Sequence, residues 1–162
     1  KGFVAMSLSD VIRDVLRAQG LEESRERMIE AGRVLRAEGG PSVLGERMLA
    51  KMDPAGDYAV DSVRPPAEVE PLRGDGRPFL LLWVDADESV RFDRMRARGR
   101  VGDPETLEEL RTLEARELGS ADPAAQQLNA VQDISDRVLK NDAGIDVLSA
   151  ALDEVLANVI TS

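Results

Sequence analysis

The chain has 162 residues, 43% of them hydrophobic and 32% charged, with 31 acidic against 21 basic side chains and a net charge of −10. This composition is typical of a globular domain and argues against a general nucleic-acid binder, which needs a broad basic face. The sequence contains neither cysteine nor histidine, which excludes disulfides, thiolate chemistry and Ser-His-Asp catalysis. No apolar run approaches the ~18 residues of a membrane span, so we expect a cytoplasmic enzyme or interaction domain without a membrane partner.

The first half of the chain predicts two strands separated by helices. The expected elements are a strand over residues 3–8, helices over 10–19, 22–38 and 41–52, and a strand over 58–61. Ser9 should cap the first helix and Gly20 should end it. Asp61, Ser62 and Arg64 form a polar cluster at the end of the second strand, where open α/β sheets bind ligands. The alternative interpretation is a capping aspartate beside a surface arginine.

The second half begins with Phe79–Val84, a continuous apolar run that indicates a strand buried on both faces. Asp85 and Asp87 should end this strand and cap a helix that begins near Glu88. The remaining expected elements are a helix from Asp103-Pro104 to about 118, a short helix over 122–131, a strand over 137–140 and a helix over 145–159. This alternation predicts an α/β fold with a parallel sheet and helices on both faces.

The helix after Phe79–Val84 is rich in arginine. Arg91, Arg94 and Arg98 follow the spacing i, i+3 and i+7, so they should project from one face. Arg96 and Arg100 extend the cluster in a chain that is otherwise acidic. Such a helix after a strand suits an anionic ligand, most simply a polyphosphate. The alternative is a solvated helix face supported by neighbouring acids.

Several short motifs occur in a characteristic order along the chain. They are Ser7-Leu-Ser-Asp-x-Ile-Arg13, Gly32-x-x-Leu-Arg36, Val60-Asp-Ser-x-Arg-x-Pro-x-Glu-Val69, Arg91-Phe-x-Arg94, Arg98-x-Arg100-x-Gly-Asp-Pro-x-Thr106 and Lys140-Asn-Asp142. The sequence resembles the dephospho-CoA-kinase-like, adenylate-kinase-like branch of P-loop nucleotide kinases. Within it, the chain is most similar to the kinase-like domain found alone in archaeal proteins or preceding deoxycytidylate-deaminase domains.

The resemblance covers nearly the whole chain and implies one domain over residues 1–162 with a P-loop NTPase-like, three-layer α/β/α fold. It implies a helical acceptor-binding region at about 9–52 and a lid region at about 91–122. The activity implied is phosphoryl transfer from Mg-ATP to a nucleoside or deoxynucleoside monophosphate. Dephospho-CoA as acceptor and a non-catalytic nucleotide-sensing or regulatory domain are the alternatives. A fused or partner domain of nucleotide metabolism is also expected.

The resemblance also assigns roles to individual residues. Catalytic roles fall to Asp61, Arg94, Arg98 and Arg100, and acceptor binding falls to Asp10, Arg13, Arg36 and Arg64. Asn141 would contact the donor adenine, and Asp61 would organise Mg²⁺ or the acceptor hydroxyl. The three lid arginines would stabilise charge on the transferring phosphoryl group.

One part of the kinase pattern is missing from this sequence. The first strand and the phosphate loop G-x-x-x-x-G-K-[ST] should lie just before Lys1, with that strand between those near Val60 and Phe79. We therefore expect the natural protein to include such a segment. Without that loop, residues 1–162 alone should bind nucleotides weakly at most and show no turnover. They should also fold poorly, because each buried backbone group left unpaired by the missing strand costs about 1–3 kcal/mol.

Overall fold

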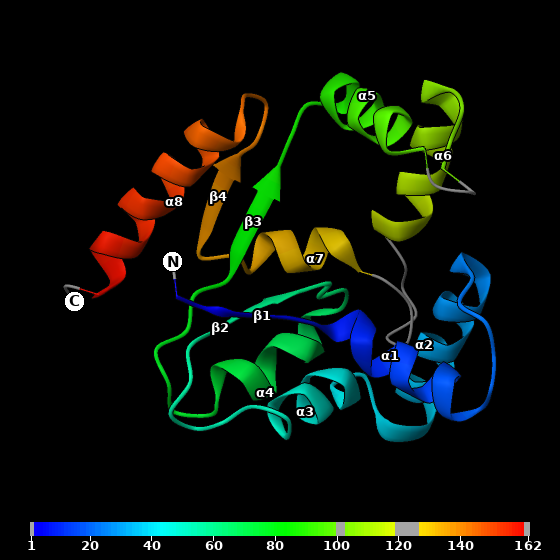
Figure 1. Ribbon diagram of the computed structural model, residues 1–162, viewed down its shortest axis with the longest axis vertical. Helices are drawn as coiled ribbons and strands as arrows, with labels where there is room; N and C mark the ends of the chain where they lie inside the picture. The colour runs from blue at the N-terminus through cyan, green and yellow to red at the C-terminus, as the bar shows by residue number, and fades with distance from the viewer. Residues whose placement is uncertain (1, 100–102, 119–126, 161–162) are drawn as a thin grey trace. The chain divides into compact units, whose positions relative to one another are not determined.

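The computed structural model describes residues 2–99, 103–118 and 127–160, in which helices alternate with short strands (Figure 1). The chain divides into two compact units. The first contains residues 1–79 and 115–133, and the second contains residues 80–114 and 134–162. The mixed α/β class expected from the sequence is confirmed. Within the described ranges, no helix is both long enough and apolar enough to cross a membrane.

The first unit is built on two parallel strands and the helices that follow them. Its elements are β1 (Val4–Ser7), α1 (Leu8–Ala18), α2 (Arg25–Gly39), α3 (Val43–Leu49), β2 (Tyr58–Asp61), the 3-10 helix η1 (Pro66–Glu68), α4 (Val69–Arg73) and α7 (Leu128–Asp133). Val4 lies opposite Tyr58, and Ser7 lies opposite Asp61. The carboxyl ends of both strands therefore meet at one edge, from which α1 begins directly.

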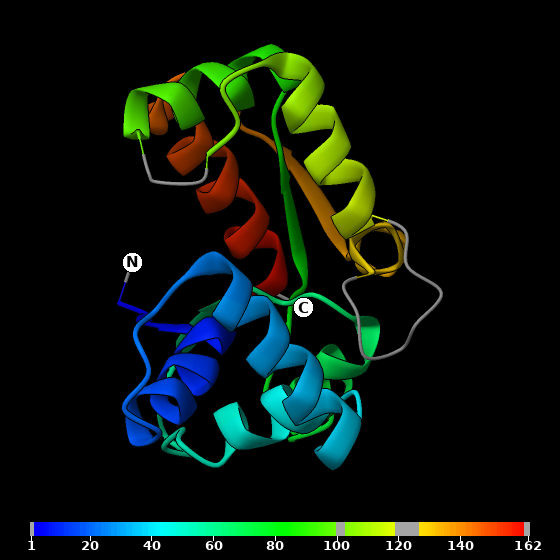
Figure 2. The same cartoon turned by 90° about the vertical axis from the view of Figure 1, so that its right-hand side faces the viewer.

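The core of the first unit lies between α1, α2 and α3. Its buried members are Leu8, Val11, Ile12, Leu35, Val43, Leu44 and Met48. Leu8, Val11 and Ile12 follow helical spacing, so they form one apolar stripe along α1. Figures 1 and 2 both show α1, α2 and α3 gathered together beside the β1–β2 pair. This packing holds the start of α1 at the carboxyl end of β1.

Gly45 of α3 is expected to accept alanine only at a cost in stability, because a Cβ there would lie 2.8 Å from Pro71 Cγ and closer still to the carbonyl oxygen of Glu68. Alanine gains about 1 kcal/mol over glycine in a helix, but overpacking costs about 1–3 kcal/mol. Because the nearest atom belongs to the backbone, we expect Gly45→Ala to lower the free energy of unfolding by about 1 kcal/mol. Urea denaturation measures this loss. Gly144→Ala is the control, since no atom lies within 4 Å of its Cβ position; equal stability of both variants would contradict the prediction.

The second unit contains the other parallel strand pair. Its elements are β3 (Leu82–Asp85), α5 (Glu88–Arg98), the first part of α6 (Leu107–Leu118), β4 (Arg137–Lys140) and α8 (Ile145–Ile160). Leu82 lies opposite Arg137, and Asp85 lies opposite Lys140. Figures 1 and 2 show α8 running beside β4. The carboxyl ends of β3 and β4 therefore share one edge, as those of β1 and β2 do.

The four strands form two parallel pairs instead of the one sheet that the alternation predicted. Within the described residues, β2 pairs with β1 alone and β3 pairs with β4 alone. The strand expected over Phe79–Val84 begins at Leu82, and Val84 is 51% exposed. The prediction of a strand buried on both faces is therefore wrong, because the face of β3 that carries Val84 is exposed.

Two expected helix caps in these units are wrong. Helix α1 begins at Leu8, so Ser7 and not Ser9 occupies the N-cap position. Helix α5 begins at Glu88 as predicted, but Asp87 makes no side-chain cap. Its backbone N–H instead donates to Asp142 at 2.6 Å. Gly20, with φ of 68°, follows the end of α1 as the sequence predicted.

The start of α6 also differs from the sequence prediction. Thr106 accepts a hydrogen bond from the backbone N–H of Glu109 at 3.2 Å, and the helix begins at Leu107. Asp103 precedes the helix and accepts hydrogen bonds from Arg98, so its carboxylate is used in an ion pair and not as a cap. The start expected for the next helix, at residues 122 and 123, lies outside the described residues.

Candidate functional site

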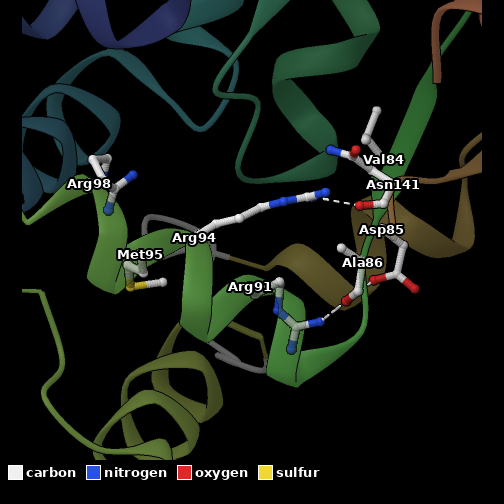
Figure 3. A pocket seen from close by; sticks show the side chains of 8 residues that line it. All are labelled: Val84, Asp85, Ala86, Arg91, Arg94, Met95, Arg98 and Asn141. Carbon is white, nitrogen blue, oxygen red and sulfur yellow. Dashed lines mark hydrogen bonds and ion pairs between the residues drawn. The ribbon is translucent and has the colours of Figure 1, made fainter. Parts of the chain in front are cut away.

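An open pocket of about 360 Å³ lies at the carboxyl end of β3 in the second unit (Figure 3). Its lining residues are Val84, Asp85, Ala86, Arg91, Arg94, Met95, Arg98 and Asn141, and we call it the arginine pocket. Three of these residues are the α5 arginines spaced i, i+3 and i+7, so the prediction that they share a face is confirmed. The volume falls in the range of small-molecule sites.

Two of the pocket arginines form ion pairs with carboxylates. Arg91 donates from Nε and Nη2 to the two carboxylate oxygens of Glu114, each at 2.8 Å. The hydrogen bonds with Glu114 raise the pKa of Arg91. Arg98 donates to Asp103 at 2.8 and 3.3 Å. Both charges are thus partly compensated within the second unit.

Arg94 has a different environment from its neighbours on α5. It donates from Nη1 to the carbonyl oxygen of Asn141 at 2.5 Å and from Nη2 to that of Ala143 at 2.9 Å. In the part of the chain that the structure describes, no carboxylate forms an ion pair with this guanidinium. Arg94 therefore brings a positive charge without a carboxylate partner into the arginine pocket. Figure 3 shows its side chain extended toward Asn141.

Asp85, the acidic residue of the pocket, is engaged by Lys140 of β4. The Lys140 ammonium donates to the Asp85 carboxylate and lowers the pKa of that group. The backbone N–H of Asn141 donates to the carbonyl oxygen of Asp85 at 2.6 Å, which places the predicted adenine contact beside β3. The sequence assigned Asp85 a role in ending a strand and capping a helix, but none in binding a ligand. Its neutralisation by Lys140 leaves the pocket favourable to an anion.

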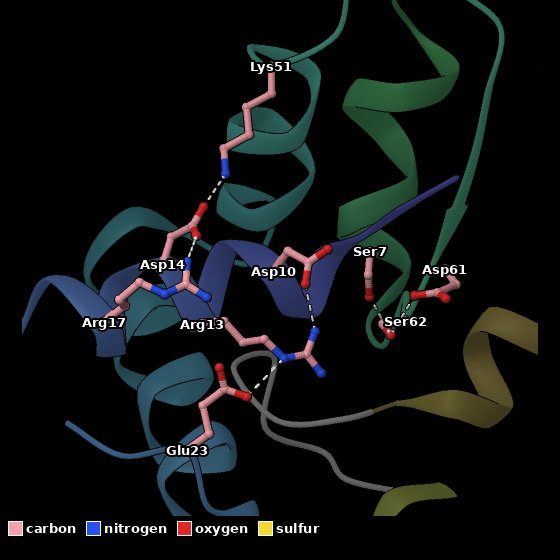
Figure 4. Close-up of polar contacts among 9 residues, drawn as sticks. All are labelled: Ser7, Asp10, Arg13, Asp14, Arg17, Glu23, Lys51, Asp61 and Ser62. Carbon is pink, nitrogen blue, oxygen red and sulfur yellow. Dashed lines mark hydrogen bonds and ion pairs between the residues drawn. The ribbon is translucent and has the colours of Figure 1, made fainter. Parts of the chain in front are cut away.

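A second polar site lies in the first unit, at the carboxyl ends of β1 and β2 (Figure 4). Ser7 donates from Oγ to Ser62 Oγ at 3.0 Å, and Ser62 donates to Asp61 Oδ1 at 2.8 Å. We call these three residues the Ser–Asp cluster. Its position matches the edge at which parallel sheets bind ligands. Asp61 and Ser62 were placed in a polar cluster by the sequence, whereas Ser7 was not.

Ser62 has a backbone conformation that serine rarely adopts. Its φ is 66°, the single positive φ at a non-glycine residue in the described ranges. Such strain costs about 1–3 kcal/mol and is concentrated at functional sites. No local sequence signal distinguishes this serine from one in an ordinary turn.

The predicted acceptor residues Asp10 and Arg13 lie together on α1. Arg13 donates to Asp10 at 2.7 Å and to Glu23 at 3.2 Å. The hydrogen bond with Asp10 raises the pKa of Arg13. Asp10 belongs to the first turn of the helix that Ser7 starts, so this pair lies at the same end of the unit as the Ser–Asp cluster (Figure 4).

The structure places Arg36 and Arg64 around Glu68, a residue of the quoted motif to which the sequence assigned no role. Arg36 is 6% exposed and donates from Nε and Nη2 to Glu68 Oε1 at 2.9 and 2.8 Å. The backbone N–H of Arg64 donates to Glu68 Oε2 at 2.9 Å, and Glu68 is fully buried. Burial raises the pKa of Glu68, and Arg36 opposes that rise. The acceptor role of Arg36 stays a prediction, and Arg100 lies outside the described residues.

Comparison with known proteins places the chain in a family. A UPF0200 protein of Hyperthermus butylicus is 31% identical over 160 residues, covering 98% of this chain and 82% of its own length. The chain belongs to the UPF0200 family. UPF0200 proteins of Methanosarcina barkeri and Pyrococcus horikoshii are 28% and 24% identical, over 98% and 100% of the chain and 84% and 87% of their own lengths. Their names state no activity, and no family model matches the chain.

Proposed function

We propose that this UPF0200 protein transfers a phosphoryl group from Mg-ATP to a nucleoside or deoxynucleoside monophosphate. The observation that carries the proposal is Arg94, whose uncompensated guanidinium lies in a pocket beside Asn141 at the carboxyl end of a parallel strand. A preorganised cation of this kind stabilises the charge that develops on a transferring phosphoryl group. Arg98 would assist from the next turn of the same helix.

The first unit supports the acceptor side of the proposal. Asp10 and Arg13 would hold the acceptor nucleotide. Asp61 would accept a hydrogen bond from the hydroxyl of that nucleotide or bind Mg²⁺. The Ser–Asp cluster offers one carboxylate and two hydroxyls, which are hard oxygen ligands suited to Mg²⁺, with phosphate and water completing its shell. When bound, Mg²⁺ would neutralise phosphate charge. The chain's own contribution is to position the acceptor and to supply the arginines.

The strand pairing supports a kinase-like sheet with a further strand. Parallel strands seldom form isolated pairs, yet each strand in the described residues has a single partner. The P-loop kinase resemblance expects a further strand that leads into the phosphate loop. The backbone N–H groups of that loop would cradle the β- and γ-phosphates.

A nucleotide-sensing module without turnover is the second candidate. It is favoured by the ion pairs of Arg91 with Glu114 and of Arg98 with Asp103, since two of the three pocket arginines are already compensated. Binding of a nucleotide needs one free cation and a shaped pocket, whereas catalysis needs several preorganised charges. Dephospho-CoA remains an alternative acceptor for the kinase.

Replacement of Asp61 tests the proposal. If Asp61 serves the metal or the acceptor, Asp61→Asn should abolish phosphoryl transfer by the natural protein and leave the thermal midpoint nearly unchanged, because the side chain is exposed. Activity and thermal midpoint are measured on one preparation. Asp57→Asn is the matched control, since Asp57 is an exposed aspartate at the opposite end of β2. Full activity combined with a stability loss of ~1 kcal/mol would show that Asp61 only fixes the turn.

A further inference from the structure

We infer that Arg36 and Glu68 are positioning residues that hold Ser62 in its left-handed conformation and thereby keep the Ser–Asp cluster assembled. This inference rests on the proposed function for the ligand, but its structural part stands on contacts within the first unit. It assigns Arg36 a role other than direct contact with an acceptor phosphate.

Glu68 is the centre of this arrangement because both of its oxygens are used. Oε1 accepts two hydrogen bonds from Arg36 on α2, which lies 32 residues earlier in the chain. Oε2 accepts from the backbone N–H of Arg64 at 2.9 Å. The side chain therefore fastens the segment after β2 to α2. A buried carboxylate needs such partners, because desolvation without them is very costly.

The segment after β2 is fixed at further points on either side of Ser62. Asp61 is held in register opposite Ser7 on β1. Two residues beyond Ser62, the carbonyl oxygen of Arg64 accepts from the backbone N–H of Gln127 at 3.2 Å. The close approach of Gly45 to the Glu68 carbonyl fixes the far end.

These fixed points explain the unusual conformation of Ser62. Only Ser62 and Val63 connect Asp61 to Arg64, whose backbone N–H and carbonyl are both hydrogen-bonded. A positive φ in a non-glycine residue persists when the surrounding structure over-determines it. In this conformation Ser62 Oγ lies between Ser7 and Asp61 and bonds both. Loss of the acceptor for the Arg64 N–H should therefore release the turn and disperse the cluster.

The test separates this role from a general contribution to stability. In Arg36→Met/Glu68→Leu an apolar pair replaces the ion pair, an exchange that is often neutral for stability. It also removes the acceptor of the Arg64 N–H. Arg36→Met/Glu68→Gln keeps an amide oxygen that can accept this bond and serves as the rescue variant. Arg33→Met/Glu30→Leu removes an exposed ion pair from the same helix and is the control.

Three quantities are measured on each protein: the thermal midpoint, the amide exchange of residues 62–64, and the calorimetric affinity for AMP, CMP and UMP. For Arg36→Met/Glu68→Leu we expect a nearly unchanged midpoint with exchange at least about tenfold faster. Its affinity should fall by at least about tenfold. The rescue and control variants should resemble the wild type.

Wild-type exchange and affinity in a folded Arg36→Met/Glu68→Leu protein would overturn the inference. If that variant does not fold, amide exchange of the wild type decides. An Arg64 amide that exchanges as fast as an exposed loop amide shows that Glu68 does not hold this backbone, whereas strong protection of that amide supports the inference. If the wild type binds none of the three nucleotides, none of the three is the acceptor in the proposed reaction. The exchange results of the folded variants then decide the structural inference alone.

Discussion

Arg94→Ala is expected to lower kcat/KM for phosphoryl transfer by the natural protein by about 10²-fold or more, as loss of a preorganised charge donor does. Arg94 is the pocket arginine whose hydrogen bonds go to backbone carbonyls, at 2.5 and 2.9 Å, so its charge is available to a phosphate. Steady-state kinetics with Mg-ATP and a nucleoside monophosphate measures the loss. Arg94→Lys should recover little of it, because lysine cannot reproduce the planar two-point contact.

Arg96→Ala is the matched control for Arg94→Ala. Arg96 lies on the same helix and its replacement removes the same charge, but it does not line the arginine pocket and instead lies over the ring of Phe92. Its variant should keep kcat/KM within about threefold of the wild type, the scale of a surface charge change. Equal losses in Arg94→Ala and Arg96→Ala would show that helix charge in general, and not the pocket, supports the activity.

Arg36→Ala is expected to lower the free energy of unfolding by about 3–5 kcal/mol, because it leaves the buried Glu68 carboxylate without its cation. Burial raises the pKa of Glu68, and removal of Arg36 takes away an opposing influence. A carboxyl group with a raised folded-state pKa favours the folded state below its unfolded pKa and loses that contribution as the pH rises. The deficit of the variant should therefore be smaller at acidic pH than at neutral pH.

Urea denaturation of the wild type and of Arg36→Ala, from acidic to neutral pH, tests both the size of the stability loss and its pH dependence. The titration of other groups cancels in the difference between the two free energies of unfolding. Arg33→Ala is the control, because Arg33 pairs with Glu30 on the exposed side of the same helix. Its effect should stay within about 0.5 kcal/mol, as for most surface substitutions. A loss below about 1 kcal/mol in Arg36→Ala would place the pair among weak surface interactions.

Much of the local structure could be predicted because its causes are local. Helical spacing of apolar residues identified α1, and the sequence limits of β2 and β4 agree with the structure. The spacing of Arg91, Arg94 and Arg98 depends only on 3.6 residues per turn, so their shared face could be read directly. The parallel direction of both strand pairs followed from the alternation of elements.

The features that escaped prediction depend on residues far apart in the sequence. Arg36 and Glu68 are 32 residues apart, and arginine and glutamate are ordinarily exposed, so no local pattern indicates their burial. The left-handed Ser62 results from contacts on both sides of it and not from its own residue type. The division of the strands into two pairs was also missed, because hydrophobic pattern shows that a strand exists but not which edges find partners.

The most direct test of nucleotide kinase activity is transfer of radiolabelled γ-phosphate from Mg-ATP to a panel of nucleoside and deoxynucleoside monophosphates. We predict ATP-dependent phosphorylation of at least one of them. Saturable nucleotide binding by the natural protein without any transfer would contradict the kinase and favour the sensing module.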